Sequence, residues 1–534
     1  MSYNKNVSSI CPSCRLEISG SPQFCPHCGA SVIAGGVSSS SPKQSSASGG
    51  GSASGVLWST VGLIAGLGLT VAIVLFVRHQ QDAKIADLAS ETHAQSQVMP
   101  GDIRVILRMH GSNTIGSVLA VDLAKSFLAK RGAKNVQTFT KSKDEILVTG
   151  SEAGNSVPQA IEIYAHGSGS GFADLAASRC DIAMASRRVE PSELSATAFL
   201  GDLTREASEN VIALDGVAVI VNRANPARTL TVEQIRDLFS GKATDWKSTG
   251  LDYEGPVHVY ARAEGSGTLE TFRTLVMRKT SITDKATAIE DSTELSQKVS
   301  ADAYGIGFIG LPYVLDAKAV AVAETEEGMG GDTKKLTTPL LPTVSTVATE
   351  DYPLSRRLYL YTAAVPTNHL VAEFVRFVKS DEGQDLVEKA KFVSQKVCPD
   401  CKRDVPLPPA DAPSDYQQIT QNAVRQPLDF HFRFGSAALD PKALDDVDRM
   451  ARYLHDLNEE KDHVILLGFA DNRGTAESNR KLSRERAEAI RAELAQRGTL
   501  ALQVTGLGSE MPIKSNDTEE GREKNRRVEV WLKK

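Results

Sequence analysis

The sequence predicts a multidomain α/β protein with a single membrane-spanning helix. Apolar, strand-like runs alternate with helical patterns over residues 101–395, which is typical of domains with mainly parallel sheets. A second alternation of strand and helix patterns covers residues 426–534. Residues 56–77 contain no charged side chain. The chain of 534 residues is long enough for roughly three or four domains.

Two Cys-x-x-Cys pairs lie near the N-terminus, Cys11 with Cys14 and Cys25 with Cys28. This spacing suits four thiolates around a tetrahedral Zn²⁺, and so short a segment has no core with which to fold without a metal. Two disulfides are the alternative. Residues 1–34 resemble the zinc-ribbon family, which implies a closed, structural Zn²⁺ site.

The next segments predict a membrane anchor. Residues 35–55 are almost entirely Gly, Ser and Ala, which indicates a flexible linker. As a helix, residues 56–77 would span about 33 Å, enough to cross a hydrocarbon core of about 30 Å. The run begins too late in the chain and is too long for a cleaved signal peptide. We therefore expect a single-pass inner-membrane helix, followed by a polar stalk at 78–100.

The α/β segment contains three turns of one design, each rich in Gly and Ser and each placed between a strand and a helix. They are His110–Gly116, Gly167–Gly171 and Arg262–Thr268. The free N–H groups at a helix start attract an anion, and Arg262 adds a permanently charged, forked donor. One such turn is weak evidence because many serve only as tight connections. Three in one segment predict a pocket for a small anion.

Residues 101–395 resemble periplasmic phosphate-binding proteins of the PstS type, which have a two-lobed (type II) solute-binding fold. Three further runs carry this resemblance together with the three turns, namely 181–187, 230–246 and 304–310. The resemblance implies one lobe at about 101–215 with a return at 350–395, a second lobe at about 216–349, and a ligand between them. The oxyanion contacts that it implies are Thr114, the Ile115 backbone, Ser168, Arg262, Ser266, Gly267 and Thr268.

One position departs from this family. Its best-known members carry an Asp after the serine of the Ala-Ser step, and that Asp accepts the proton of a protonated phosphate. Here Arg187 follows Ser186. The resemblance therefore does not imply that this chain discriminates phosphate from sulfate.

The remaining cysteines fall within or just after this domain. Cys180 stands alone beside an apolar strand, and we expect it to be buried and inert. Cys398 and Cys401 open the linker predicted at 396–425, where a disulfide is favoured in an oxidising compartment over half a zinc site or a redox-active pair.

The C-terminal segment, 426–534, closely resembles the OmpA-like peptidoglycan-binding domain, which has an α+β fold. The resemblance rests on Asp471, Gly474, Asn479, Leu482-Ser483, Arg486-Ala487 and Asn525-Arg-Arg-Val528. The diaminopimelate of a cell-wall stem peptide carries an ammonium and a carboxylate on one carbon. Asp471 supplies an acceptor and Arg486 a forked donor for that pair, and the resemblance implies that both bind peptidoglycan together with Asn479.

The orientation in the membrane follows from chemistry, because the few flanking charges give only a weak and opposite preference. Four-thiolate zinc sites persist in a reducing compartment, and a solute-binding domain is useful outside the cell membrane. We expect residues 1–55 in the cytoplasm and the chain after residue 78 in the periplasm.

Two functions agree with these features, and neither is enzymatic, because no nucleophile with a paired His is present. A net charge of −6 and the lack of a basic block argue against nucleic acid as a partner. The first function is a peptidoglycan-tethered receptor for phosphate or a similar oxyanion, which serves an ABC permease or a sensor. The second is a structural tether between inner membrane and cell wall whose solute-binding fold no longer binds solute.

Overall fold

The computed structural model divides the chain into two compact units, Met1–Ser96 and Gln97–Lys534. It describes residues 8–10, 17–19, 102–142, 144–152, 157–264, 266–327, 334–397, 412–432, 438–456, 464–499 and 501–533. In the first unit, strands β1 (Ser8–Ile10) and β2 (Glu17–Ser19) pair antiparallel. The four N-terminal cysteines, the predicted membrane helix and stalk, and Cys398 and Cys401 lie outside the described residues. Within the described ranges, no helix has the length and apolar character needed to cross a membrane.

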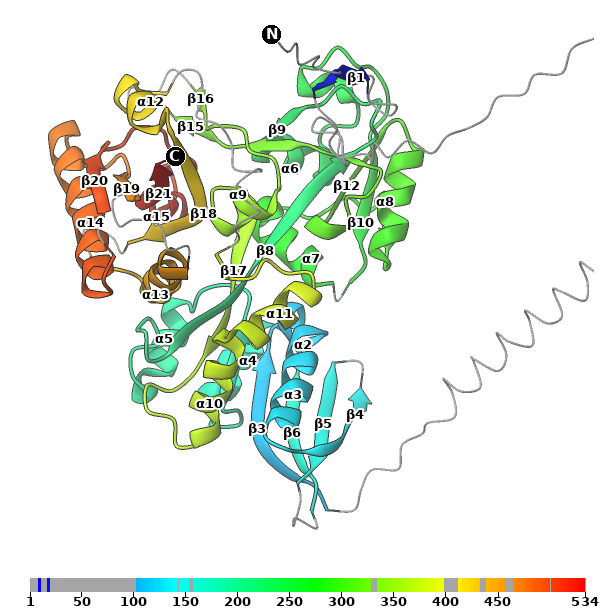
Figure 1. The fold of residues 1–534 in the computed structure, drawn as a ribbon. Coiled ribbons are helices and arrows are strands. Elements are labelled where there is room, and N and C mark those ends of the chain that lie inside the picture. Colours follow the sequence, from blue (N-terminus) through cyan, green and yellow to red (C-terminus); the bar gives the residue numbers. More distant parts are fainter. Residues whose placement is uncertain are drawn as a thin grey trace, which may run out of the picture. The chain divides into compact units, whose positions relative to one another are not determined.

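The second unit begins with a two-lobed α/β domain built on one 11-stranded sheet (Figure 1). The strand order along the sheet is β11-β10-β12-β8-β17-β7-β3-β6-β5-β4, and β13 also pairs with β8. Strands β3, β6 and β7 run parallel to one another, as do β10, β11 and β12. These observations confirm the predicted two-lobed α/β architecture.

The first lobe places helices against the half of this sheet that ends at β4, around a core that includes Leu107, Phe127, Ile161 and Phe374. Its elements are β3 (Arg104–Gly111), α2 (Asn113–Gly116), α3 (Leu119–Lys130), β4 (Lys134–Ser142), β5 (Glu145–Ser151), β6 (Gln159–Tyr164), α4 (Ser168–Ala176), β7 (Ile182–Ala185), α5 (Pro191–Ala196), β17 (Ser355–Tyr361), α10 (His369–Lys379) and α11 (Asp381–Lys389).

The second lobe has its own core, in which Trp246, Phe272 and Phe308 are fully buried. Helix α6 shows why the sequence folds this way: Thr231 and Gln234 form a capping box at its start, and Gly241 ends it in the left-handed conformation. The elements are β9 (Thr229–Thr231), α6 (Val232–Ser240), β10 (His258–Arg262), α7 (Gly267–Phe272), β11 (Thr287–Ile289), α8 (Ser292–Ala301), β12 (Gly305–Gly310), β13 (Lys318–Ala319), β14 (Ala321–Ala323), β15 (Thr325–Glu327), β16 (Lys334–Leu336) and α9 (Val344–Ala348).

Strand β8 (Glu209–Val221) belongs to both lobes, and every one of its residues is buried. Its first part, through Gly216, pairs with β17, and its second part, from Val217, pairs with β12. The chain returns to the first lobe through the segment between α9 and β17. Residues 214–217 and 349–355 therefore form the two connections between the lobes, and together we call them the hinge.

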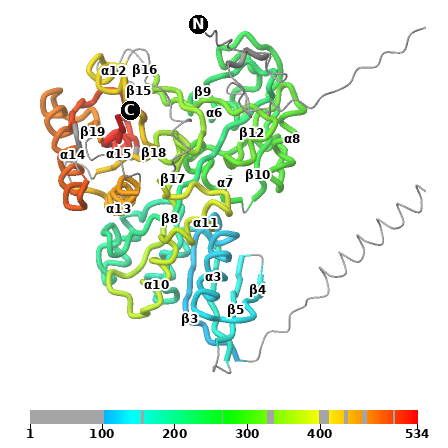
Figure 2. The backbone as a smooth tube through the Cα atoms, viewed as in Figure 1, coloured from blue at the N-terminus to red at the C-terminus, as the bar shows by residue number. Residues whose placement is uncertain are grey.

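The C-terminal domain is a four-stranded sheet in the order β18-β21-β19-β20, covered by two long helices (Figure 2). Its elements are α12 (Ser414–Thr420), β18 (Ala423–His431), α13 (Pro441–Asp456), β19 (Val464–Gly468), α14 (Ala476–Gln496), β20 (Ala501–Gly506), α15 (Glu519–Asn525) and β21 (Arg527–Lys533). This arrangement confirms the predicted α+β class for the segment.

Helix α12 lies within the range predicted to be linker. The Tyr416 ring packs edge-on against Trp531, with ring centroids 5.8 Å apart, and its hydroxyl donates to Glu529 Oε2 at 3.0 Å. Residues 412–420 are thus an integral part of the C-terminal domain. The sequence did not indicate this helix, because the preceding residues are rich in Pro and Ala and one short helix shows little hydrophobic periodicity.

Candidate functional site

A cavity of about 290 Å³ lies between the two lobes. The first lobe contributes Thr114, and the second contributes Arg262, Ser266, Gly267 and Thr268. Of the seven residues predicted to contact the oxyanion, these five line one cavity. The Ile115 side chain is fully buried in the core beside it.

Gly267 allows the two lobes to touch at this cavity. A Cβ atom at position 267 would lie 2.5 Å from Thr114 Oγ1 and 2.7 Å from Thr114 Cα. The turn before α7 is held by the Ser266 hydroxyl, which accepts the Leu269 N–H at 3.4 Å. Any side chain at residue 267 would therefore push the Thr114 turn away from α7.

Arg262 is the cation that the sequence predicted for this site. Its Nη1 donates to Ser292 Oγ at 2.5 Å and its Nη2 to the Glu290 carbonyl at 2.7 Å. The Nε atom is buried and has no hydrogen-bond partner among the described residues. Burial lowers the pKa of Arg262, although guanidinium stays charged at neutral pH.

A second arginine, Arg356 of β17, was missed by the sequence analysis; it does not line the cavity but contacts Thr114 and Gly267, which do. Its Nη2 donates to Thr114 Oγ1 and to the Gly267 carbonyl, both at 2.8 Å, and its Nε donates to Asp215 Oδ2 at 3.3 Å. Arg356 is buried, and burial lowers its pKa. It stands 242 residues from Thr114 in the chain, so no local pattern points to it.

A carboxylate, Glu270 of α7, was also missed. Its Oε1 accepts the Ser186 hydroxyl at 3.2 Å and its Oε2 accepts the Thr114 hydroxyl at 3.4 Å. The Ser168 and Ser186 hydroxyls are 3.2 Å apart. Ser168, which was predicted to contact the oxyanion, thus joins the site through Ser186 and does not line the cavity itself.

Arg187 occupies the position of the missing Asp and forms ion pairs within the first lobe. Its guanidinium donates to both carboxylate oxygens of Glu193, at 2.7 and 2.9 Å, and lies 3.4 Å from Glu190. The hydrogen bond to Glu193 raises the pKa of Arg187. The positive charge of Arg187 is therefore balanced by carboxylates of the first lobe.

In the C-terminal domain, Asp471 follows β19 and its carboxylate is engaged on both sides. Oδ1 accepts the Arg473 N–H at 3.0 Å and Oδ2 accepts Arg526 Nη1 at 3.0 Å. Asn479 on α14 donates to the Asp471 carbonyl at 3.0 Å, which fixes this turn against the helix. Arg526 was not singled out from the sequence, although the Asn525-Arg-Arg run carried the resemblance.

Arg486, the predicted forked donor, is fully buried. Its Nη1 donates to the Phe469 carbonyl at 3.5 Å, and its guanidinium lies 5.6 Å from the centre of the Phe432 ring. Burial, with the nearby charge of Arg526, lowers its pKa to about 10. The structure thus gathers Asp471, Asn479 and Arg486 around the end of β19.

The predicted zinc ligands cannot be placed, since all four cysteines fall outside the described ranges. Across those ranges, no three His, Cys, Asp or Glu side chains are grouped to hold a metal ion. Cys180 is buried and reduced, and burial raises the pKa of its thiol to about 12.

Comparison with known proteins gives two family matches. A model described as a PBP superfamily domain matches residues 93–382, and an OmpA family model matches residues 431–526. Protein SphX of Synechococcus elongatus is 30% identical over 242 residues, which cover 44% of this chain and 68% of that protein. The phosphate-binding protein PstS of Staphylococcus epidermidis is 31% identical over 232 residues, which cover 43% of this chain and 68% of that protein. An ABC-type phosphate transport receptor from Vibrio cholerae, a solved structure, is 22% identical with a TM-score of 0.40, and the match covers 54% of this chain and 99% of that one.

Proposed function

This chain belongs to the PBP superfamily, and we propose that it is a non-enzymatic receptor for a small oxyanion, phosphate, held at the bacterial cell wall. The observation that carries the proposal is that Thr114, Arg262, Ser266, Gly267 and Thr268 line one cavity between the lobes. These residues come from distant segments, yet all offer hydroxyl, backbone or guanidinium donors. The names of the relatives, which include phosphate-binding proteins, support phosphate as the oxyanion.

The site offers donors of the kind that a tetrahedral oxyanion requires. Arg262 provides a charge-assisted hydrogen bond, and its buried Nε has no partner among the described residues. Arg356 supplies a second positive charge next to Thr114. In this proposal the anion is bound and released unchanged.

Glu270 borders the cavity through its contact with Thr114, and in this proposal it supplies the acceptor that position 187 lacks. Phosphate carries at least one proton near neutral pH, and a carboxylate accepts that P–O–H as a hydrogen bond. Sulfate has no proton to donate, so its oxygen atoms would face the carboxylate with like charge and no hydrogen bond. The Glu270 carboxylate, placed among the Thr114 and Ser186 hydroxyls, therefore supports a preference for phosphate over sulfate.

The remaining parts of the chain give the receptor its position. We propose that Asp471, Asn479 and Arg486 bind the diaminopimelate stem peptide of peptidoglycan, supported by the OmpA family match. We further propose that residues 56–77 anchor the protein in the inner membrane, with a structural Zn²⁺ ribbon on the cytoplasmic side and the two-lobed domain in the periplasm. The receptor would then deliver the bound anion to an ABC permease, or report its presence to a sensor protein.

Isothermal titration tests this function. The full-length protein, purified in detergent and stripped of bound ligand, is titrated with phosphate and then with sulfate from pH 5 to 8. Saturable phosphate binding is the expected result. If a folded protein binds neither anion, the receptor is ruled out and the structural tether between membrane and wall takes its place.

A further inference from the structure

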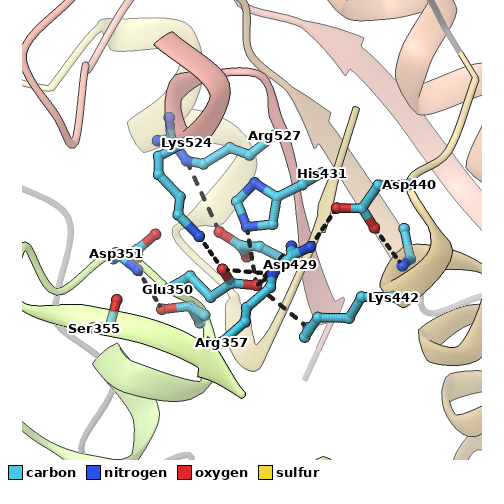
Figure 3. Close-up of polar contacts among 12 residues, drawn as sticks. Glu350, Asp351, Ser355, Arg357, Asp429, His431, Asp440, Lys442, Lys524 and Arg527 are labelled. Atoms are coloured by element: carbon cyan, nitrogen blue, oxygen red, sulfur yellow. Dashed lines mark hydrogen bonds and ion pairs between the residues drawn. The ribbon is translucent and has the colours of Figure 1, made fainter. Parts of the chain in front are cut away.

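The C-terminal domain packs directly on the hinge of the two-lobed domain. Glu350 and Asp351 belong to the return connection between the lobes, and both are buried. Glu350 has a φ of +64°, a left-handed conformation that is uncommon for any residue other than glycine. Polar side chains of the neighbouring domain surround its carboxylate (Figure 3).

The Glu350 carboxylate is surrounded by groups from three elements of the C-terminal domain. Lys524 of α15 forms a short ion pair with it, Lys442 of α13 lies 3.6 Å away, and His431 of β18 lies 3.8 Å away. Burial lowers the pKa of His431 to about 3, so this imidazole is neutral at physiological pH. The two lysines therefore supply the positive charge that the second domain brings to Glu350.

Two further buried ion pairs extend the contact on either side. Arg357 of β17 binds Glu350 with its Nε and Asp440 of the C-terminal domain with its Nη1, at 2.9 and 2.6 Å. Arg425 of β18 lies 2.6 Å from Asp351 Oδ2. Charges buried this deeply are costly unless they are paired, so the interface is specific to this arrangement.

The same domain also contacts each lobe away from the hinge. In the first lobe, Lys379 of α10 pairs with Asp445 of α13 at 2.7 Å. In the second lobe, Glu324 accepts the Ser515 N–H at 2.7 Å and lies 3.6 Å from Lys514. The C-terminal domain thus bridges both lobes across their hinge.

In this bridged arrangement the lobes already meet at the anion site. Thr114 and Ser186 of the first lobe hydrogen-bond Glu270 of the second, and Arg356 of β17 binds the Gly267 carbonyl of α7. Successive side chains of a strand point to opposite faces. β17 therefore directs the Arg356 guanidinium toward Thr114 and Gly267, which line the anion cavity. It directs the Arg357 guanidinium toward Glu350 and Asp440 at the domain interface.

We propose that the C-terminal domain is a clamp across the hinge, so that its docking on Glu350 and the closure of the lobes on an anion are thermodynamically linked. The docked clamp holds the lobes in the closed arrangement that binds the anion, and release of the clamp lowers the affinity for the anion. Linkage is reciprocal, so a bound anion stabilises the docked clamp by the same factor. This proposal rests on the proposed anion-binding function.

Charge reversal at the interface tests the clamp in the full-length protein. Lys524→Glu places a second carboxylate beside Glu350. Asp445→Lys is a milder variant, because that side chain is partly exposed, and Lys379→Asp is its matching rescue. Lys242→Glu, at an exposed pair far from the interface, is the control.

Two readouts separate docking from binding. Hydrogen exchange over residues 349–361 reports docking, and titration with inorganic phosphate reports affinity. We expect Lys524→Glu and Asp445→Lys to raise the exchange and to weaken phosphate binding by about tenfold. The exchange of Lys379→Asp with Asp445→Lys should recover both. Saturating phosphate should slow the same exchange in the unmodified protein.

The alternatives give different results. Faster exchange with unchanged phosphate affinity would overturn the clamp and leave the receptor function intact. Unchanged exchange in both variants would show that these ion pairs do not hold the domain. An unmodified protein that binds no phosphate would overturn the receptor function and the linkage together. Retained binding to cell-wall sacculi shows that the C-terminal domain of a variant still folds.

Discussion

Arg356 and Arg357 are neighbours on β17, yet their guanidinium groups serve different domains. Arg356 Nη2 donates to Thr114 Oγ1 at 2.8 Å in the anion cavity, while Arg357 Nη1 donates to Asp440 Oδ2 at 2.6 Å in the C-terminal domain. Both are buried. A single strand therefore connects the candidate anion site with the C-terminal domain, and a shift of this strand would change the contacts of both.

Arg262→Ala should abolish detectable phosphate binding or weaken it by about a hundredfold, because a charge-assisted hydrogen bond contributes roughly 1.5–3 kcal/mol. Calorimetry on the full-length protein measures the change. Arg223→Ala is the matched control, since that arginine is exposed and lies outside the cavity. Unchanged affinity in Arg262→Ala would show that the anion binds elsewhere.

Glu270→Gln should remove the discrimination against sulfate. The unmodified protein is expected to prefer phosphate. In the variant, sulfate should bind within about tenfold of phosphate, because the neutral amide does not repel the sulfate dianion and can donate a hydrogen bond to it. Parallel titrations with the two anions measure this. Glu264→Gln controls for net charge, because Glu264 is an exposed residue at the cavity and is paired with Arg273. Equal affinities in the unmodified protein would contradict the role of Glu270.

Asp471→Ala and Arg486→Ala should each release the protein from purified cell-wall sacculi, since the first removes the acceptor and the second the forked donor for diaminopimelate. Co-sedimentation with sacculi measures the loss. Arg484→Ala, an exposed position on the same helix, should sediment like the parent. Arg486→Lys keeps the charge without the fork and should bind weakly. Full sedimentation of both alanine variants would place the wall contact at other residues.

Glu162 should make the stability of the first lobe dependent on pH in the acid range. Its hydrogen bond with His110, at 3.3 Å, outweighs the opposing effect of burial and lowers the pKa of Glu162 to about 2. A carboxylate with a depressed folded-state pKa stabilises the fold above its unfolded pKa, near 4.3, and this contribution is lost as the pH falls toward 2.

Glu162→Gln should therefore lower the free energy of unfolding by roughly 3 kcal/mol at pH 7, and by much less near pH 2. Thermal unfolding across this range measures the difference. Glu254→Gln, at an exposed pair with Lys247, should show no such trend. A constant difference between the parent and Glu162→Gln at every pH would contradict the assigned pKa.

The sequence predicts those parts of the site that local pattern encodes. The turns at Thr114 and at Arg262–Thr268 combine a strand end, small residues and a helix start, and the structure brings them to one cavity. Arg356 and Glu270 escape such analysis. Arg356 is the second residue of a fully buried strand, and the turn before it, Tyr352–Ser355, contains no glycine. Glu270 lies within a helix, where a single acid is most often a solvated residue.

The domain interface also lies beyond sequence reasoning. Glu350 contacts Lys442 and Lys524 only because the chain folds back over long separations, and each of these residues alone is typical of a protein surface. The same holds for the Arg526 contact with Asp471 across 55 residues. Pairing over such separations depends on the packed fold and leaves no periodic signal.

Strand β8 has a consequence for any attempt to separate the lobes. Because its first part completes one half of the sheet and its second part completes the other, a chain cut between residues 216 and 217 would leave each half with a broken, apolar edge strand. Unpaired edges of this kind recruit other chains and aggregate. The two lobes are therefore a single cooperative unit of folding, and cutting them apart would yield two aggregation-prone fragments in place of two half-receptors.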